Sequence, residues 1–360
     1  MGRLTNLRDI IGMIKDKASQ GKATLTSNPK TPSLHLALLK ATTHDPSTLP
    51  HPKHIATLLS FGHSSRATAA AAIEAIMDRL QSTQDCSVAV KCLINIHHII
   101  RDGSFILQDQ LSVYPSTGGR NYLKLSNFRD NATPITWELS SWVRWYARYL
   151  EHLLSASRVL GFFLCSNSST SEKDKEEGKV SELTNSDLLK DIDSLVGLLE
   201  EICQRPGCLH LQNNTLVGEI TNMVGEDHLS AINDLLIRVN EFHERLSCLS
   251  FGNSVELACI LKRLDTCKEG IVDLPIRKRD FAESLWCVVS EMKGKVESGK
   301  GYGEEGRLLL TLGRGEKASE SARFGERVLS YSHSRAFSSS RFSLNRYGFT
   351  ELDCFESYAR

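Results

Sequence analysis

The segment SVAVKCLINIHHIIRDG, residues 87–103, is apolar on nearly every face when it is drawn as a helix. A helix that is apolar all round is buried inside a protein, whereas a surface helix has one apolar stripe. This segment therefore predicts the central, buried helix of the fold. Its adjacent histidines, His97 and His98, point about 100° apart on a helix and are poorly placed to share a metal ion. We predict that one is a hydrogen-bonded core histidine and that the other lies at a helix contact.

Helical patterns continue on both sides of this segment. Proline marks the start of two of them, at Pro32 and Pro52, and Gly62 marks an end. The chain lacks convincing strand patterns with a period of two residues. We therefore predict an all-α fold with helices over residues 33–42, 53–62, 64–82, 87–103, 136–163, 185–203, 226–249, 254–274 and 278–296.

Changes in composition divide the chain into five parts. The N-terminal end begins with a short amphipathic stretch and then becomes polar, whereas the C-terminal end is rich in serine and arginine, which is typical of a disordered tail. A polar, charged stretch without periodicity separates two helical regions. The predicted parts are a basic, amphipathic N-terminal segment (1–24), a helical domain (25–165), a linker (166–184), a C-terminal helical bundle (185–296) and a flexible tail (297–360).

The charge is balanced overall, with 43 basic and 43 acidic side chains, but it is uneven along the chain. Residues 1–60 hold eight Lys or Arg, three Asp and no Glu. This excess favours an acidic partner or surface, with ordinary variation in surface charge as the alternative. Ten cysteines without C-x-x-C pairs favour a reducing, cytosolic compartment. No apolar run approaches the roughly 18 residues of a membrane span, so we expect any membrane contact to be peripheral.

No segment carries a complete catalytic or cofactor-binding pattern. Residues 301–306 match G-x-G-x-x-G but lack the strand and helix that a dinucleotide site requires. Residues 294–301 resemble a phosphate-binding loop in which Gly301 replaces the necessary Ser or Thr. Four aromatic side chains at helical spacing indicate a packing stripe rather than a base-stacking platform: Trp142, Trp145, Tyr146 and Tyr149. We predict no enzymatic activity, no cofactor, no metal and no nucleic-acid partner.

The segment LLKATTHDPSTLPHPKHI, residues 38–55, joins two helical patterns and contains five basic or titratable side chains but one acid. A metal site, an anion or nucleotide site and a solvated turn are the alternatives. The order of the histidines matches no four-ligand zinc set. For an anion, Lys40 ends one helix, whereas Lys53 and His54 lie in the first turn of the next, where unpaired backbone N–H groups are expected. Pro50 and Pro52 stiffen the approach to that turn.

Three ordered blocks of sequence resemble the ANTH domain of clathrin assembly proteins. The first is Lys40-Ala41-Thr42 followed by Pro50, Lys53 and His54, which is similar to the family's lipid-binding signature. Residues 91–103 resemble the family's helix with paired histidines. Residues 122–154 resemble the loop and long helix that follow it.

The resemblance implies a superhelical, ENTH-like stack of helices that continues into a helical bundle. It also implies a cytosolic, membrane-peripheral adaptor that binds phosphatidylinositol 4,5-bisphosphate, promotes clathrin coat assembly and vesicle budding, and recruits vesicle SNAREs through its later helices. Clathrin-coated pits, coated vesicles and the Golgi apparatus are the expected locations. The implied phosphoinositide-binding residues are Lys40, His51, Lys53 and His54.

The chain departs from the family pattern in the tail, where the sequence lacks the family's Asn-Pro-Phe and Asp-Pro-Phe tripeptides, and in the loop. His51 stands where the family has a lysine, and seven residues (43–49) rather than six separate the two parts of the signature. The cations of the loop supply roughly 2–4 kcal/mol toward an anionic surface, more at mildly acidic pH if the histidines titrate near ~6.5. Asp-Leu-Leu clathrin motifs occur at 187–189 and 234–236, in helical patterns where we expect them to be packed. The alternative is a SNARE- or cargo-binding scaffold with weak lipid binding and no direct clathrin contact.

Overall fold

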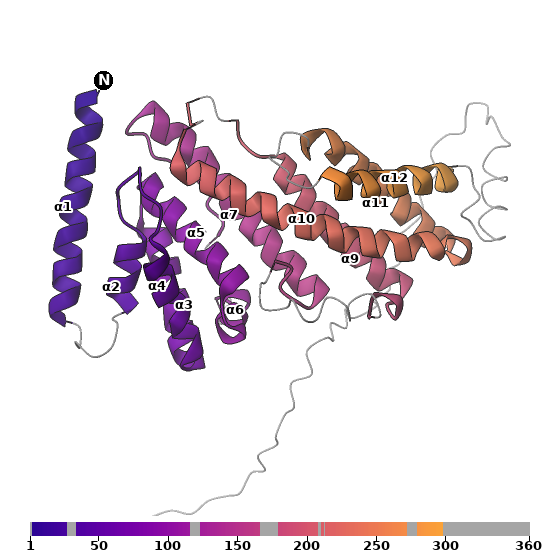
Figure 1. Cartoon of the computed structure of the whole chain (residues 1–360), viewed down its shortest axis with the longest axis horizontal. Helices are drawn as coiled ribbons and strands as arrows, with labels where there is room; N and C mark the ends of the chain where they lie inside the picture. The colour runs from indigo at the N-terminus through magenta and orange to yellow at the C-terminus, as the bar shows by residue number, and fades with distance from the viewer. Residues whose placement is uncertain are drawn as a thin grey trace, which may run out of the picture. The chain divides into compact units, whose positions relative to one another are not determined.

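The computed structural model describes residues 2–26, 34–115, 123–165, 179–207, 210–211, 213–271 and 279–297. Within these ranges all regular structure is helical, which confirms the predicted all-α class. Figure 1 shows the helices, which are α1 (Gly2–Thr26), α2 (Leu34–Ala41), α3 (Pro52–Ser60), η1 (Phe61–His63), α4 (Arg66–Ser82), α5 (Cys86–Asp102), α6 (Phe105–Ser112), α7 (Pro134–Leu160), α9 (Asn185–Cys203), α10 (Thr215–Glu244), η3 (Leu246–Cys248), α11 (Phe251–Ile271) and α12 (Arg279–Glu297).

Helix α5 is the centre of the first half of the fold. It is buried almost continuously from Cys86 to Ile100, and it packs against α3, α4, α6, α7 and α10. In Figure 1 it lies between α4 and α7. Asp85 caps its start by accepting hydrogen bonds from the backbone N–H groups of Ser87 and Val88. The prediction of a central buried helix is confirmed.

Helix α7 links the first helices to those of the second half. Its start is fixed by a capping box between Thr133 and Thr136, with Pro134 at the first helical position. Its end is fixed by Gly161, whose φ of 82° suits a residue without a side chain. Because α7 packs on α5 at one side and on α9 at another, it joins the stack to the bundle.

Helices α9 to α12 form the bundle. Helix α9 packs on α7, α10 and α11, and α12 packs on α10 and α11. The predicted stack of helices that continues into a bundle is therefore confirmed. The predicted tail, apart from Glu297, lies outside the described residues, as does most of the predicted linker. None of the helices in the described ranges is both long and apolar enough to cross a lipid bilayer.

A buried polar cluster joins α5, α7 and α10. The His97 ring contacts the Tyr146 hydroxyl at 2.7 Å through Nδ1 and the Asp227 carboxylate at 2.5 Å through Nε2. The Tyr149 hydroxyl donates to the same carboxylate oxygen at 2.6 Å. His98 is half-buried and lies 3.0 Å from the Asp102 carboxylate on its own helix. His97 is therefore the predicted core histidine.

The predicted aromatic stripe on α7 is also confirmed. All four of its side chains are buried, with relative exposures of 0–1 %: Trp142, Trp145, Tyr146 and Tyr149. Successive rings contact one another, and the Trp145 indole donates a hydrogen bond of 2.8 Å to the carbonyl of Glu201 in α9. The stripe is thus the packing face between the stack and the bundle.

Three helices depart most from the prediction. Helix α1 continues to Thr26, through the stretch that was expected to be only polar. Helix α10 begins at Thr215, eleven residues early, because Asn214 caps the N–H groups of Leu216 and Val217. Helix α6 was not predicted; the Ser104 hydroxyl caps it. Each difference arises at a start or an extension that a local polar contact stabilises.

Candidate functional site

The loop between α2 and α3 carries the predicted site residues. Lys40 lies in the last turn of α2, and His51 is the N-cap of α3. The His51 Nδ1 atom accepts a hydrogen bond from the backbone N–H of Lys53 at 3.1 Å, and the His51 carbonyl accepts from the N–H of His54 at 2.8 Å. The expectation of unpaired N–H groups in this turn is therefore wrong, because Pro52 has no N–H and His51 occupies the next two. An anion at this turn would be bound by side chains.

The structure brings all four predicted side chains together. Lys40, His51 and Lys53 are exposed, His54 is half-buried, and the rings of His51 and His54 lie 5.7 Å apart. Burial and the nearby positive charges of Lys40, His51 and Lys53 lower the pKa of His54. The same charges that disfavour protonated His54 would favour a bound anion.

The single acid of the loop does not neutralise these cations. The Asp45 carboxylate accepts hydrogen bonds from the backbone N–H and the hydroxyl of Ser47, at 2.9 and 2.7 Å. Burial raises the pKa of Asp45, but the Ser47 hydrogen bonds outweigh this effect and hold it below its ordinary value. In the part of the chain that the structure describes, no carboxylate forms an ion pair with Lys40 or Lys53. The loop is thus an exposed group of positive charge.

Lys91 of α5 fixes the first part of the loop through hydrogen bonds. Its ammonium group, on a side chain with 0 % exposure, donates hydrogen bonds to the carbonyl and hydroxyl of Thr43 at 3.1 and 2.8 Å and to the carbonyl of Asp45 at 2.6 Å. Burial lowers the pKa of Lys91 to about 8. These three contacts satisfy two backbone carbonyls and one hydroxyl of half-buried residues, and they fix the path of the chain after α2.

Arg79 of α4 fixes Thr42, the residue before those that Lys91 contacts. Its Nε atom donates to the hydroxyl of Thr42, and its Nη2 atom donates to the Thr42 carbonyl at 2.7 Å. The Thr42 hydroxyl in turn donates to the carbonyl of Leu38 at 2.6 Å. The threonine of the Lys-Ala-Thr motif is therefore a buried anchor, and it sets the position of the exposed Lys40 two residues earlier.

Helix α1 docks beside the loop through its polar and small residues. The Asp16 carboxylate accepts hydrogen bonds from the backbone N–H of His44 at 2.8 Å and from its ring Nδ1 at 2.6 Å. Arg8 pairs with Asp85 at 2.9 Å and with Asp130 at 2.5 Å. Gly12 lies against His44, since a Cβ atom there would be 2.7 Å from the His44 Cβ. The spacing of four residues places these groups on one face of α1.

The apolar residues of α1 lie on its other side, exposed to solvent. Their relative exposures run from 45 % to 61 %, for Leu7, Ile10, Ile11, Met13 and Ile14. A helix normally buries such residues and exposes its polar ones. We call this group the apolar stripe of α1; the opposite face of the helix contacts the basic loop through Asp16 and His44.

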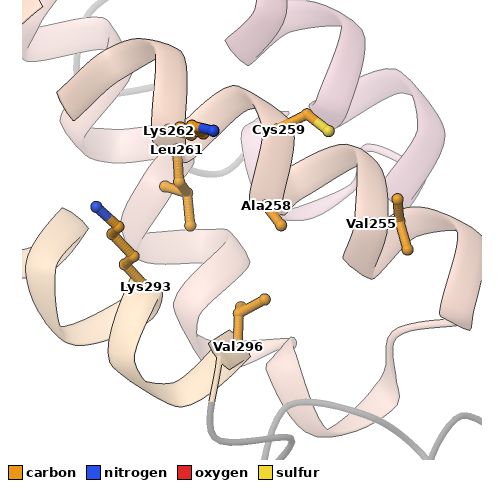
Figure 2. Close-up of a pocket in the computed structure, with 7 residues that line it drawn as sticks. All are labelled: Val255, Ala258, Cys259, Leu261, Lys262, Lys293 and Val296. Carbon is orange, nitrogen blue, oxygen red and sulfur yellow. The ribbon is translucent and has the colours of Figure 1, made fainter. Parts of the chain in front are cut away.

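The bundle carries a separate feature, an apolar groove between α11 and α12. Its volume is about 420 Å³. In Figure 2 Val255, Ala258 and Leu261 of α11 and Val296 of α12 face the groove, with Lys262 and Lys293 at one end. The Lys293 ammonium group pairs with Asp265 at 2.7 Å. The groove lies in the region predicted to bind SNAREs or cargo.

Comparison with known proteins identifies the family. The family model for the ANTH domain matches residues 33–271, which include the basic loop and helices α2 to α11. The chain belongs to the ANTH domain family. The ANTH match starts after α1 and ends before α12, so these two helices flank the matched region.

Similar full-length proteins carry related names. The chain is 54 % identical over 357 residues to an Arabidopsis thaliana protein named "Putative clathrin assembly protein At4g40080", with 97 % of this chain and 98 % of that protein covered. It is 35 % identical to a second Arabidopsis thaliana protein, named "Putative clathrin assembly protein At5g10410", over 80 % of this chain and 85 % of the relative. The resemblance to the ANTH family inferred from three sequence blocks is therefore confirmed.

Proposed function

We propose that this ANTH domain protein is an adaptor of clathrin coats that binds phosphatidylinositol 4,5-bisphosphate on membranes through the loop between α2 and α3. The observation that carries the proposal is the convergence of Lys40, His51, Lys53 and His54 on an exposed loop whose one acid is hydrogen-bonded to Ser47. Lys91 and Arg79 preorganise this loop, which lowers the entropic cost of binding.

The apolar stripe of α1 supports a membrane as the bound surface. Apolar side chains beside a basic group suit the boundary between lipid headgroups and acyl chains. Lys40 and Lys53 contribute roughly 2 kcal/mol near an anionic surface. Because that alone is weaker than millimolar binding, burial of the stripe and the avidity of an assembled coat supply the rest.

Vesicle co-sedimentation of the full chain tests the lipid site. We expect binding to vesicles that contain phosphatidylinositol 4,5-bisphosphate, and a loss of at least tenfold in the variant Lys40→Glu plus Lys53→Glu. The matched control is Lys190→Glu plus Lys268→Glu, which makes the same charge change on exposed residues of α9 and α11. Equal binding of the two double variants would remove the loop from the proposed site.

The proposed clathrin contact does not rest on the two Asp-Leu-Leu matches. Leu188, Leu189 and Leu235 have 0 % exposure, so these matches are packed as predicted. The proposal rests on membership of the ANTH family and on the names of the relatives. Sedimentation of purified clathrin with the full chain tests it: we expect assembled coats in the pellet that contain both proteins. Clathrin that stays in the supernatant at every ratio would contradict an assembly role.

The groove favours a second candidate, a scaffold that binds a SNARE or cargo helix. An apolar groove with lysines at one end suits an amphipathic helix with acidic residues near its end. Fluorescence anisotropy with a labelled vesicle SNARE helix tests this function. We expect Ala258→Arg, which fills the groove, to weaken binding at least tenfold, whereas Lys124→Glu, on an exposed residue outside the groove, leaves it unchanged. Equal affinities for the two variants would exclude the groove.

A further inference from the structure

Two cysteines of the bundle lie in contact across the interface of α9 and α11. Cys203 is the last residue of α9, and its thiol donates a hydrogen bond of 3.5 Å to the backbone carbonyl of Cys267 in α11. The Cys267 thiol donates a hydrogen bond of 3.5 Å to the carbonyl of Arg263, one turn earlier in α11. Cys203 is half-buried and Cys267 is 3 % exposed, and both are free thiols.

An ion pair one turn earlier holds the two helices in this register. Arg263 donates to both carboxylate oxygens of Glu200, at 2.8 Å from Nε and 2.6 Å from Nη2. Glu200 precedes Cys203 by three residues, and Arg263 precedes Cys267 by four. Residues at these spacings lie on one helix face. The bidentate pair therefore keeps the two thiols opposite each other, since its planar geometry restricts sliding of one helix along the other.

A glycine on the next turn of α11 permits the close approach. A Cβ atom at Gly270 would lie 3.0 Å from both the Cβ and the Sγ of Cys203, which is tighter than ordinary contact. Because Gly270 has no side chain, Cys203 lies directly on α11. Cys267 and Gly270 thus both lie against the side chain of Cys203.

We propose that Cys203 and Cys267 form a peroxide-sensitive dithiol that closes to an intrachain disulfide between α9 and α11. The thiolate of Cys203 attacks one oxygen of hydrogen peroxide. The O–O bond breaks, hydroxide leaves and takes up a proton, and Cys203 becomes a sulfenic acid. The Cys267 thiol then attacks that sulfur; the S–S bond forms, the S–O bond breaks and water leaves. Two thiols lose two electrons, and one peroxide becomes two waters.

The order of these steps follows from the surroundings of the two thiols. Contact with the Cys267 side chain lowers the pKa of Cys203, which favours its thiolate, the reactive form. The same contact and burial raise the pKa of Cys267, so Cys203 is the thiol that reacts first with peroxide. Cys92 provides a contrast, since burial raises its pKa to about 12 and no second thiol contacts it in the described part of the chain.

Peptide mapping of the full chain tests the proposal. The parent for this test carries Cys248→Ser, Cys259→Ser and Cys287→Ser, which remove exposed thiols that could link two chains. After treatment with hydrogen peroxide, alkylation and digestion without reductant, mass spectrometry is expected to find one linked peptide pair that joins Cys203 to Cys267 and has lost two hydrogens. Dithiothreitol reverses the link. The unmodified chain, which keeps exposed Cys248, calibrates the peroxide treatment. If Cys203 and Cys267 are still alkylated after a treatment that fully oxidises Cys248, the proposal fails.

Two further measurements separate the roles of the two thiols. In Cys267→Ser, dimedone is expected to trap a sulfenic acid at Cys203, and Cys203→Ser removes that adduct. No adduct at Cys203 contradicts its assignment as the attacking thiol. The linked form of the parent is also expected to melt about 5 °C or more above the reduced form, because the bond closes a loop whose ends are 64 residues apart. A lower Tm for the linked form would show that the bond strains the fold, contrary to the proposal.

Discussion

The basic loop between α2 and α3 and the polar cluster around His97 use similar residues for opposite purposes. In the cluster, each charged or polar group meets a partner from another helix: His97 contacts Tyr146 and Asp227, and Tyr149 contacts Asp227 as well. In the loop, Lys40 and Lys53 face solvent without a carboxylate in the described residues. A paired cluster contributes to the fold, whereas an unpaired exposed one costs stability and is available to an anion.

The largest expected effect is at Asp227, the shared acceptor of the buried cluster. Burial raises the pKa of this carboxyl, but His97 and Tyr149 outweigh burial and keep it below its ordinary value. We expect Asp227→Asn to lower the free energy of unfolding by about 3–5 kcal/mol, since it removes a buried charge that pairs with Arg101 at 3.8 Å and accepts from Tyr149. Urea denaturation measures the loss. The matched control is Asp102→Asn, which removes a partner of half-buried His98 and should cost about 1 kcal/mol or less. Equal losses in the two variants would show that the buried Asp227 carboxylate contributes no more to stability than the Asp102 carboxylate.

A smaller effect is expected at Lys91, which is buried like the His97 cluster and donates hydrogen bonds to the basic loop. The variant Lys91→Met leaves the carbonyls of Thr43 and Asp45 without this donor, so we expect a loss of about 1–3 kcal/mol in unfolding free energy. Vesicle binding should also weaken, because the loop is no longer fixed. Lys124→Met, on an exposed lysine, is the control. A variant of Lys91 with full stability and full binding would show that the loop holds its conformation alone.

The stability difference between the parent and Lys91→Met should depend on pH. The pKa of Lys91 is about 8 in the folded chain and 10.5 as the ordinary value, so the unfolded chain binds more protons between these two values. The parent should therefore gain stability relative to Lys91→Met as the pH rises through this interval. A stability difference that stays flat across the interval would argue against a lowered pKa.

A still smaller effect is expected at His51, where the family pattern has lysine. We expect His51→Lys to bind vesicles about fivefold more tightly, through about 1 kcal/mol of added attraction. The variant should also lose about 1 kcal/mol of stability, because lysine cannot accept the hydrogen bond from the Lys53 N–H. Co-sedimentation and urea denaturation measure the two changes. Unchanged vesicle affinity together with lower stability would show that His51 caps α3 but does not contribute to lipid binding.

The smallest effect concerns the pH dependence of binding through His54. Burial and the neighbouring cations lower the pKa of His54, so its ring gains charge at a pH below the ordinary value of 6.5. Vesicle affinity should rise as the pH falls below that value, and His54→Asn should flatten the rise. A rise that is complete above the ordinary value would contradict the lowered pKa.

Much of the fold follows from local sequence patterns, and the contacts around the site do not. Apolar periodicity predicts α5, α7 and α9 closely, and the two helices that flank the loop place Lys40 and His54 at its ends. Lys91 and Arg79 were missed, because they act on residues 48 and 37 positions away in the chain. One signal was present: a lysine inside the most apolar segment of the chain must find buried acceptors.

The unpaired N–H groups were predicted wrongly for a local reason. A histidine is not among the usual N-cap residues, so the sequence pattern did not indicate that the His51 ring would accept from Lys53. Local sequence patterns also did not predict which face of α1 is docked. Its apolar residues predict a buried face, and only the tertiary partners of Arg8 and Asp16 show that the opposite face is docked.

The docking of α1 through Arg8, Gly12 and Asp16 has a calorimetric consequence. Release of a helix that is held by charged and small groups exposes mainly polar surface, and polar surface lowers the heat capacity on hydration while apolar surface raises it. Detachment of α1 should therefore leave the heat capacity nearly unchanged, whereas unfolding of α5 should raise it steeply. The N-terminal helix can leave the body of the protein without the thermal signature of an opened core.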